Sequence, residues 1–133
     1  MTKEYNIPIF RAQRLDNDEL VEGYYGEDSV CLHISHYITE HGHGVANEIK
    51  PETLAIHFPS MLDINGKPIF ASLNKNGIGG DKLTDGYGEQ YTCLFNTITN
   101  SVVMQYHTKQ LQKETIGVYD RYWKTFKIIG VHL

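Results

Sequence analysis

The seven histidines are the residues whose type and spacing most invite a chemical role, because four of them fall within eleven positions. These four are His33, His36, His41 and His43. A zinc site needs neutral imidazoles that converge on one ion at about 2.0 to 2.1 Å. On the strand expected here, His33 and His36 point to opposite faces because they are three positions apart, and His41 and His43 flank Gly42 in an expected turn. We therefore expect solvated histidines and no metal ligands, while a metal held by His41 and His43 would revive an enzymatic interpretation.

The two cysteines, Cys31 and Cys93, do not form a Cys-x-x-Cys pair. This spacing removes the common zinc and redox motifs, so each cysteine is expected to be a small buried apolar residue. A nucleophilic serine would need a Gly-x-Ser-x-Gly turn, which the sequence lacks. The glycine-rich segment at residues 77–80 is not followed by the Lys-Ser or Lys-Thr of a phosphate-binding loop. We expect no catalytic residues, no metal or cofactor-binding residues and no cofactor.

The C-terminal third differs from the rest of the chain in both charge and aromatic content. Residues 101–133 contain five basic and two acidic residues, a net charge of +3, whereas the remaining residues carry −7. Aromatic rings beside Lys and Arg can stack on the bases of single-stranded nucleic acids, at about 1 to 3 kcal/mol per base. The other interpretation places the same rings in the core or in a contact between subunits. The candidate contact residues for a partner or a nucleic acid are Tyr119, Arg121, Tyr122, Trp123, Lys124 and Lys127.

Apolar residues alternate along most of the chain, which predicts strands rather than helices. Strands are expected at residues 7–14, 20–25, 30–38, 45–49, 68–71, 89–95, 101–107 and 125–132. Turns are expected at residues 16–17, 42–44, 65–66 and 96–100, and Asn65-Gly66 is expected to form a type I′ hairpin turn. The segment at 74–80 is expected to be a loop because it is rich in Gly and Asn. Only residues 108–114 favour one or two helical turns. The predicted fold class is mainly β, with antiparallel hairpins and at most one or two short helices.

The length and composition describe one ordinary domain that spans residues 1–133. The chain is 41% hydrophobic and carries a formal charge of −4, which argues against a dominant basic surface for duplex DNA. The first ten residues include Lys3, Glu4, Asn6 and Pro8, so they lack the apolar run of a signal peptide. No stretch approaches the roughly 18 apolar residues of a membrane-spanning helix. We expect a cytoplasmic protein that has no membrane partner.

Several short segments of the chain occur in a recognisable order. The first group is Phe10-Arg11-Ala12, then Leu15-Asp16-Asn17 and Leu20-Val21-Glu22-Gly23-Tyr24-Tyr25. The second group is Ile49-Lys50-Pro51-Glu52-Thr53, then Asp63-Ile64-Asn65-Gly66-Lys67-Pro68-Ile69-Phe70, Gly80-Asp81-Lys82-Leu83 and Ile128-Ile129-Gly130. In this order the segments resemble the YopX family of phage and prophage proteins. The resemblance implies a mainly β protein with a small SH3-like barrel, encoded by a bacteriophage or a prophage, and it carries over no catalytic residue.

The expected function is that of a non-enzymatic interaction or assembly module of phage type. A small barrel leaves unpaired strand edges that a second subunit can cover, so we expect a homo-oligomer. A phage or host protein is the other protein partner considered. The alternative is a small β-barrel that binds single-stranded nucleic acid through the basic and aromatic C-terminal segment, although the net charge does not favour nucleic acid.

Overall fold

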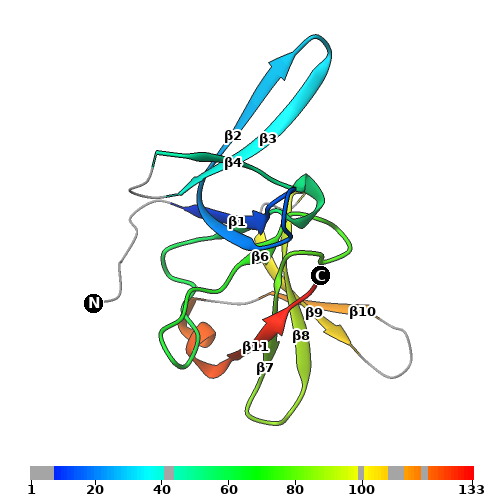
Figure 1. Ribbon diagram of the computed structural model, residues 1–133. Helices are drawn as coiled ribbons and strands as arrows, with labels where there is room; N and C mark the ends of the chain where they lie inside the picture. The colour runs from blue at the N-terminus through cyan, green and yellow to red at the C-terminus, as the bar shows by residue number, and fades with distance from the viewer. Residues whose placement is uncertain (1–7, 41–43, 99–100, 108–112, 118–119) are drawn as a thin grey trace.

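The computed structural model describes residues 8–40, 44–98, 101–107, 113–117 and 120–133. The strands are β1 (Ile9–Gln13), β2 (Leu20–Val30), β3 (His33–Glu40), β4 (Ala46–Glu48), β5 (Ala55–His57), β6 (Ala71–Ser72), β7 (Asp81–Thr84), β8 (Gln90–Asn96), β9 (Ser101–His107), β10 (Lys113–Gly117) and β11 (Lys127–Val131). Two short 3-10 helices accompany them, η1 (Pro51–Thr53) and η2 (Asp120–Thr125) (Figure 1). The predicted mainly β fold is confirmed. No helix in this part of the chain is both long and apolar enough to cross a membrane.

The described strands form one sheet, whose main path runs in the order β10-β9-β8-β6-β5-β1-β2-β3-β4. A branch leaves this path at β8, because β8 also pairs with β7, and β7 pairs with β11. The short pair between β6 and β8 is parallel, whereas the other pairs are antiparallel. The sheet curls into an open half-barrel. Because the sheet is open, its terminal strands present edges to solvent.

Alternation along neighbouring strands places one set of side chains in the main core. Leu83 on β7, Cys93 on β8 and Met104 on β9 are all buried in one cluster, and Trp123 from η2 packs into the same cluster. Burial of a large apolar side chain stabilises a fold by about 1.5 to 3 kcal/mol. A second cluster surrounds Ile38 where β1, β2 and β3 meet. The first cluster therefore packs the β7, β8 and β9 part of the sheet, and the second packs the part formed by β1, β2 and β3.

A buried ion pair joins β1 to β7. Arg11 Nη2 donates to Asp81 Oδ1 at 2.8 Å and to the Gly79 carbonyl at 3.0 Å. Asp81 Oδ2 accepts the Phe70 N–H at 2.8 Å, and the Arg11 guanidinium lies 4.4 Å from the centre of the Phe70 ring. Burial raises the pKa of Asp81, and the charge of Arg11 opposes that rise. Removing either partner would leave the other as a buried charge without a counter-ion, which costs far more free energy than the intact pair contributes.

The turn at Asn65-Gly66 differs from the predicted type I′ turn. Of its two central residues only Gly66 has a positive φ, at 77°. Asp63 Oδ1 accepts the N–H groups of Asn65 and Lys67 at 2.9 and 2.8 Å. A carboxylate that binds the backbone therefore organises this turn, and the prediction of a type I′ turn is wrong.

Two further predictions fail at particular residues. The strand expected over residues 30–38 is interrupted, because β2 continues to Val30 and β3 begins at His33 after a turn. The helix expected over residues 108–114 is wrong at Lys113 and Glu114, which begin strand β10, and residues 108–112 lie outside the described part of the chain. Pairing with β9 overrides the helical preference of Lys113 and Glu114.

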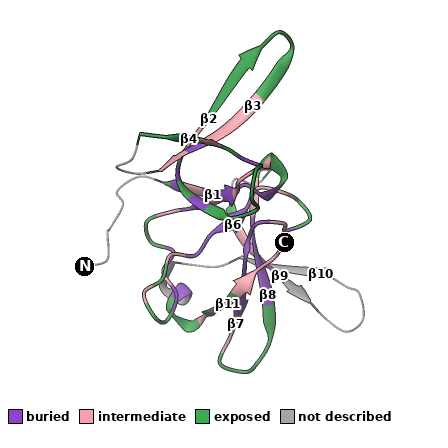
Figure 2. Ribbon diagram, viewed as in Figure 1, coloured by how far each residue is buried: buried purple, intermediate pink, exposed green. Residues whose placement is uncertain are grey.

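The β2–β3 hairpin projects away from the rest of the molecule (Figure 1). Its register runs without interruption from the pair Gly23 and Glu40 to the pair Val30 and His33. Figure 2 shows that the hairpin is buried only near its base, and residues 26–34 are all exposed. We call this exposed segment, residues 26–34, the arm.

Candidate functional site

The arm ends in a two-residue turn formed by Cys31 and Leu32. Their φ angles are 50° and 68°, the left-handed values that a type I′ hairpin turn requires at both positions. Asn and Gly are favoured at such positions, because left-handed backbone costs other residues roughly 1 to 2 kcal/mol each. Leu32 is 105% exposed, Val30 62% and Ile34 53%. A strained turn thus holds three apolar side chains in solvent.

No strand in the described part of the chain covers the outer edge of β3 along the arm. β4 pairs only with residues 37–39 of β3, so its cover stops before the arm begins. The His36 carbonyl points outward, because it accepts the Ile49 N–H at 3.0 Å from beyond the hairpin. In an antiparallel pair the backbone groups of successive residues alternate between the two sides of a strand. The N–H and C=O of Ile34 therefore also point outward, where no described strand pairs with them.

The outer edge of β2 also lacks a described partner strand along the arm, but it carries negative charge. β1 pairs with β2 only as far as Gly23. Beyond that point β2 contains Glu27 and Asp28, whereas the residues that face them on β3 are His36 and Ser35, neither of which is a carboxylate. The two edges of the arm are therefore chemically different.

A polar cluster ties the two strands together at the base of the arm. The Tyr25 hydroxyl donates to Glu27 Oε1 at 2.7 Å and lies 2.5 Å from His36 Nδ1. Because the hydroxyl has one proton, His36 Nδ1 is the donor in the second contact. Burial, together with the hydrogen bond to Glu27, raises the pKa of Tyr25 to about 12. Glu27 and His36 are direct cross-strand neighbours, so the cluster fixes the register of the hairpin.

The C-terminal residues selected from the sequence do not form one exposed surface in the described structure. Trp123 is only 2% exposed and packs beside Phe126, with ring centres 6.5 Å apart, so its ring offers no face to a nucleic-acid base. Lys124 and Lys127 are exposed. The remaining candidates are Arg121 and Tyr122, which lie in η2, and Tyr119, which lies outside the described residues.

The cysteines and histidines divide between the arm and the core. Cys93 is buried as predicted, but Cys31 is exposed, so the prediction of a buried residue is wrong there. Its place in the tight turn is the physical reason. The described residues contain no group of three or more His, Cys, Asp and Glu that is arranged to hold a metal ion. His33 is exposed on the arm, and His41 and His43 lie outside the described part.

The arm was not predicted from the sequence. Gly26, Asp28 and Ser29 are typical turn residues, which favoured an end of the strand near Tyr25. The actual turn, Cys31-Leu32, contains no turn-forming residue. The alternation of Val30, Leu32 and Ile34 across the turn instead favours one continuous strand.

Comparison with known proteins adds no relative. No family model matches the chain, and no curated protein or solved structure matches it either.

Proposed function

We propose that this protein is a non-enzymatic assembly module that forms a homo-oligomer through the arm of the β2–β3 hairpin. Its assignment to phage or prophage proteins rests on the resemblance to the YopX family and is part of the proposal. In the assembled state the β3 edges of two copies pair in antiparallel fashion around a two-fold axis. The partner of the arm is therefore a second copy of the same chain.

The strained apolar turn is the observation that carries this proposal. Folding of a single chain gains little from Leu32, because its side chain is 105% exposed. The left-handed backbone at Cys31 and Leu32 costs free energy that Asn-Gly would avoid. Backbone strain that brings no gain within one chain is typical of a functional contact. Burial of the turn against another copy supplies the missing gain.

Charge selects the β3 edge rather than the β2 edge. A two-fold pairing of β2 edges would bring Glu27 and Asp28 of both copies together, and like charges directly opposite each other destabilise a sheet. Pairing of β3 edges centred on Ile34 places Ile34 opposite itself and keeps the carboxylates on the far strand. The outward N–H and C=O of Ile34 would then bond to the same groups of the second copy. The result is a four-stranded sheet that spans the two arms.

Disulfide trapping tests the proposed register. In a Cys31→Ser background, Ile34→Cys places a thiol at the centre of the predicted pairing, where opposite Cα atoms lie about 4.5 to 5.5 Å apart. Ser29→Cys is the matched control, because Ser29 is the cross-strand neighbour of Ile34 on the β2 side. Mild oxidation should convert the Ile34→Cys variant to covalent dimers much faster than the Ser29→Cys variant. Equal rates for the two variants, or faster trapping of Ser29→Cys, would reject pairing through β3.

A further inference from the structure

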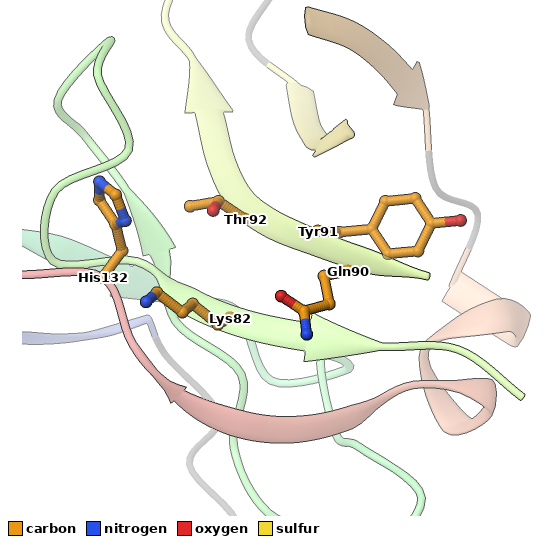
Figure 3. A pocket seen from close by; sticks show the side chains of 5 residues that line it. All are labelled: Lys82, Gln90, Tyr91, Thr92 and His132. Atoms are coloured by element: carbon orange, nitrogen blue, oxygen red, sulfur yellow. The ribbon is translucent and has the colours of Figure 1, made fainter. Parts of the chain in front are cut away.

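A small hollow lined by polar residues lies beside β7 and β8, away from the arm. It has a volume of about 230 Å³ and is lined by Lys82, Gln90, Tyr91, Thr92 and His132. Figure 3 shows Lys82 and His132 on the same side of the sheet as Thr92, with the Tyr91 ring pointing away. Because Thr92 is only 1% exposed, the polar groups that the hollow presents to solvent are the Lys82 ammonium, the His132 imidazole and the Gln90 amide.

Three strands hold these side chains in place. Lys82 lies opposite Thr92 of β8 and opposite Gly130 of β11, so β7 supplies the middle of the hollow. Leu83 and Cys93, the next residues along, are buried on the other face, which places Lys82 and Thr92 together on this face, where Lys82 is exposed and Thr92 forms the buried floor. The backbone of His132 is fixed by two bonds to the preceding loop, from its N–H to the Gly80 carbonyl at 2.9 Å and from the Gly79 N–H to its carbonyl at 2.6 Å.

Among the residues that the structure describes, none of those lining the hollow is acidic, although the chain has an excess of acidic residues. The nearest carboxylate in sequence is Asp81, and its side chain is turned to the opposite face, where it binds Arg11 and the Phe70 N–H. Within the described residues no carboxylate forms an ion pair with Lys82. The charge of this lysine is therefore available to an anion from solution.

A second hollow continues the same face. It has a volume of about 290 Å³ and is lined by Leu73, Asn74, Lys75, Leu94, Phe95, Asn96, Thr97, Ile98, Val103 and Gln105. Gln105 is the cross-strand neighbour of Thr92, so the two hollows adjoin across that pair. The described lining of the second hollow also contains no acidic residue, and it combines an apolar floor with amide groups and Lys75. A flat apolar group with polar edges fits such a lining.

From this arrangement we infer a binding site for a phosphate ester of nucleotide type. The phosphate group occupies the first hollow and bonds to Lys82 and His132, since ammonium and imidazole N–H groups are strong donors to phosphate oxygens. The base or sugar lies over Leu94 and Val103 in the second hollow. The ligand is a free nucleotide or one residue of a single strand, and both present the same phosphate and base. This site is independent of the arm and of the proposed oligomer.

Amide chemical shifts of the full chain provide the test, with inorganic phosphate, a nucleoside monophosphate and a single-stranded oligothymidylate as separate probes. We expect the nucleoside monophosphate to shift the amide signals of Lys82, Thr92 and His132. Lys82→Gln, which keeps most of the aliphatic stem, should weaken binding of all three probes by about tenfold or more through loss of a charge-assisted hydrogen bond. Lys75→Ala should weaken binding of the nucleoside monophosphate and of the oligothymidylate, but it should not affect binding of inorganic phosphate.

The control is Lys124→Ala, which removes an exposed lysine of η2. This variant should bind every probe as the parent protein does. If the oligothymidylate binds more tightly than the nucleoside monophosphate, the natural ligand is a single strand. If the monophosphate binds more tightly, the natural ligand is a free nucleotide. The inference is overturned if millimolar monophosphate leaves the three amide signals unchanged, or if Lys124→Ala weakens binding as much as Lys82→Gln does.

Discussion

Replacement of Leu32 by asparagine separates the stability of one chain from the stability of the proposed oligomer. Leu32 is 105% exposed, so its side chain contributes little to the fold of a single chain. Asparagine tolerates the φ of 68° at this position better than leucine does. The free energy of unfolding of the monomer should therefore stay the same or rise slightly.

The oligomer should respond in the opposite way. Full burial of a leucine side chain contributes about 1.5 to 3 kcal/mol, and a two-fold contact buries two copies, so loss of both costs about 3 to 6 kcal/mol. At 1.4 kcal/mol per factor of ten, the dimer Kd should rise by about 10² to 10⁴. Sedimentation equilibrium over a range of protein concentrations measures this change directly.

Ile98→Asn is the matched control for this measurement. Ile98 is 94% exposed in the loop after β8, so its substitution removes a similar apolar surface far from the arm along the sheet. The control should leave the dimer Kd unchanged. A parent protein that sediments as a monomer at millimolar concentration, or equal weakening by Ile98→Asn and Leu32→Asn, would refute the reasoning.

Three further results are expected. Exchange of Cys31-Leu32 for Asn-Gly should raise the free energy of unfolding by about 1 to 2 kcal/mol because it relieves backbone strain, and it should weaken self-association. A lower free energy of unfolding in urea denaturation would contradict the account of the turn. Asp81→Ala should lower the free energy of unfolding by about 3 to 5 kcal/mol because it leaves the buried Arg11 guanidinium without a counter-ion. Adding Arg11→Met to the same chain should recover part of that loss. Burial lowers the pKa of His57, so the unfolded chain binds more protons than the folded chain below pH 6.5, and stability should fall as the pH is lowered from 7. His57→Asn should show a smaller fall between pH 7 and pH 5, and an identical slope for both proteins would exclude this contribution.

The local part of the fold could be predicted from the sequence. The hairpin of β8 and β9 was predicted almost to the residue, because alternation marks both strands and the turn between them begins with Asn96. The loop at residues 74–80 was also predicted, since its Gly and Asn content disfavours regular structure. Such features depend on neighbours in the sequence.

The features that were missed depend on contacts across the fold. Trp123 is surrounded by basic residues in the sequence, which suggested a surface site, but long-range packing against β7, β8 and β9 buries it. The hollow at Lys82 and His132 could not be predicted either, because it forms only when β11 pairs with β7. The turn at Cys31-Leu32 uses residues with no turn preference, so sequence patterns cannot locate it.

Hydrogen exchange at the Ile34 amide tests the central claim most directly. If the β3 edges of two copies pair, this outward N–H becomes hydrogen-bonded in the dimer. Exchange of the Ile34 amide should therefore slow as the protein concentration rises, whereas exchange of the Ser29 amide on the β2 edge should not change. Pairing through the arm would be contradicted if the protein oligomerises as its concentration rises while the exchange rate of the Ile34 amide stays the same.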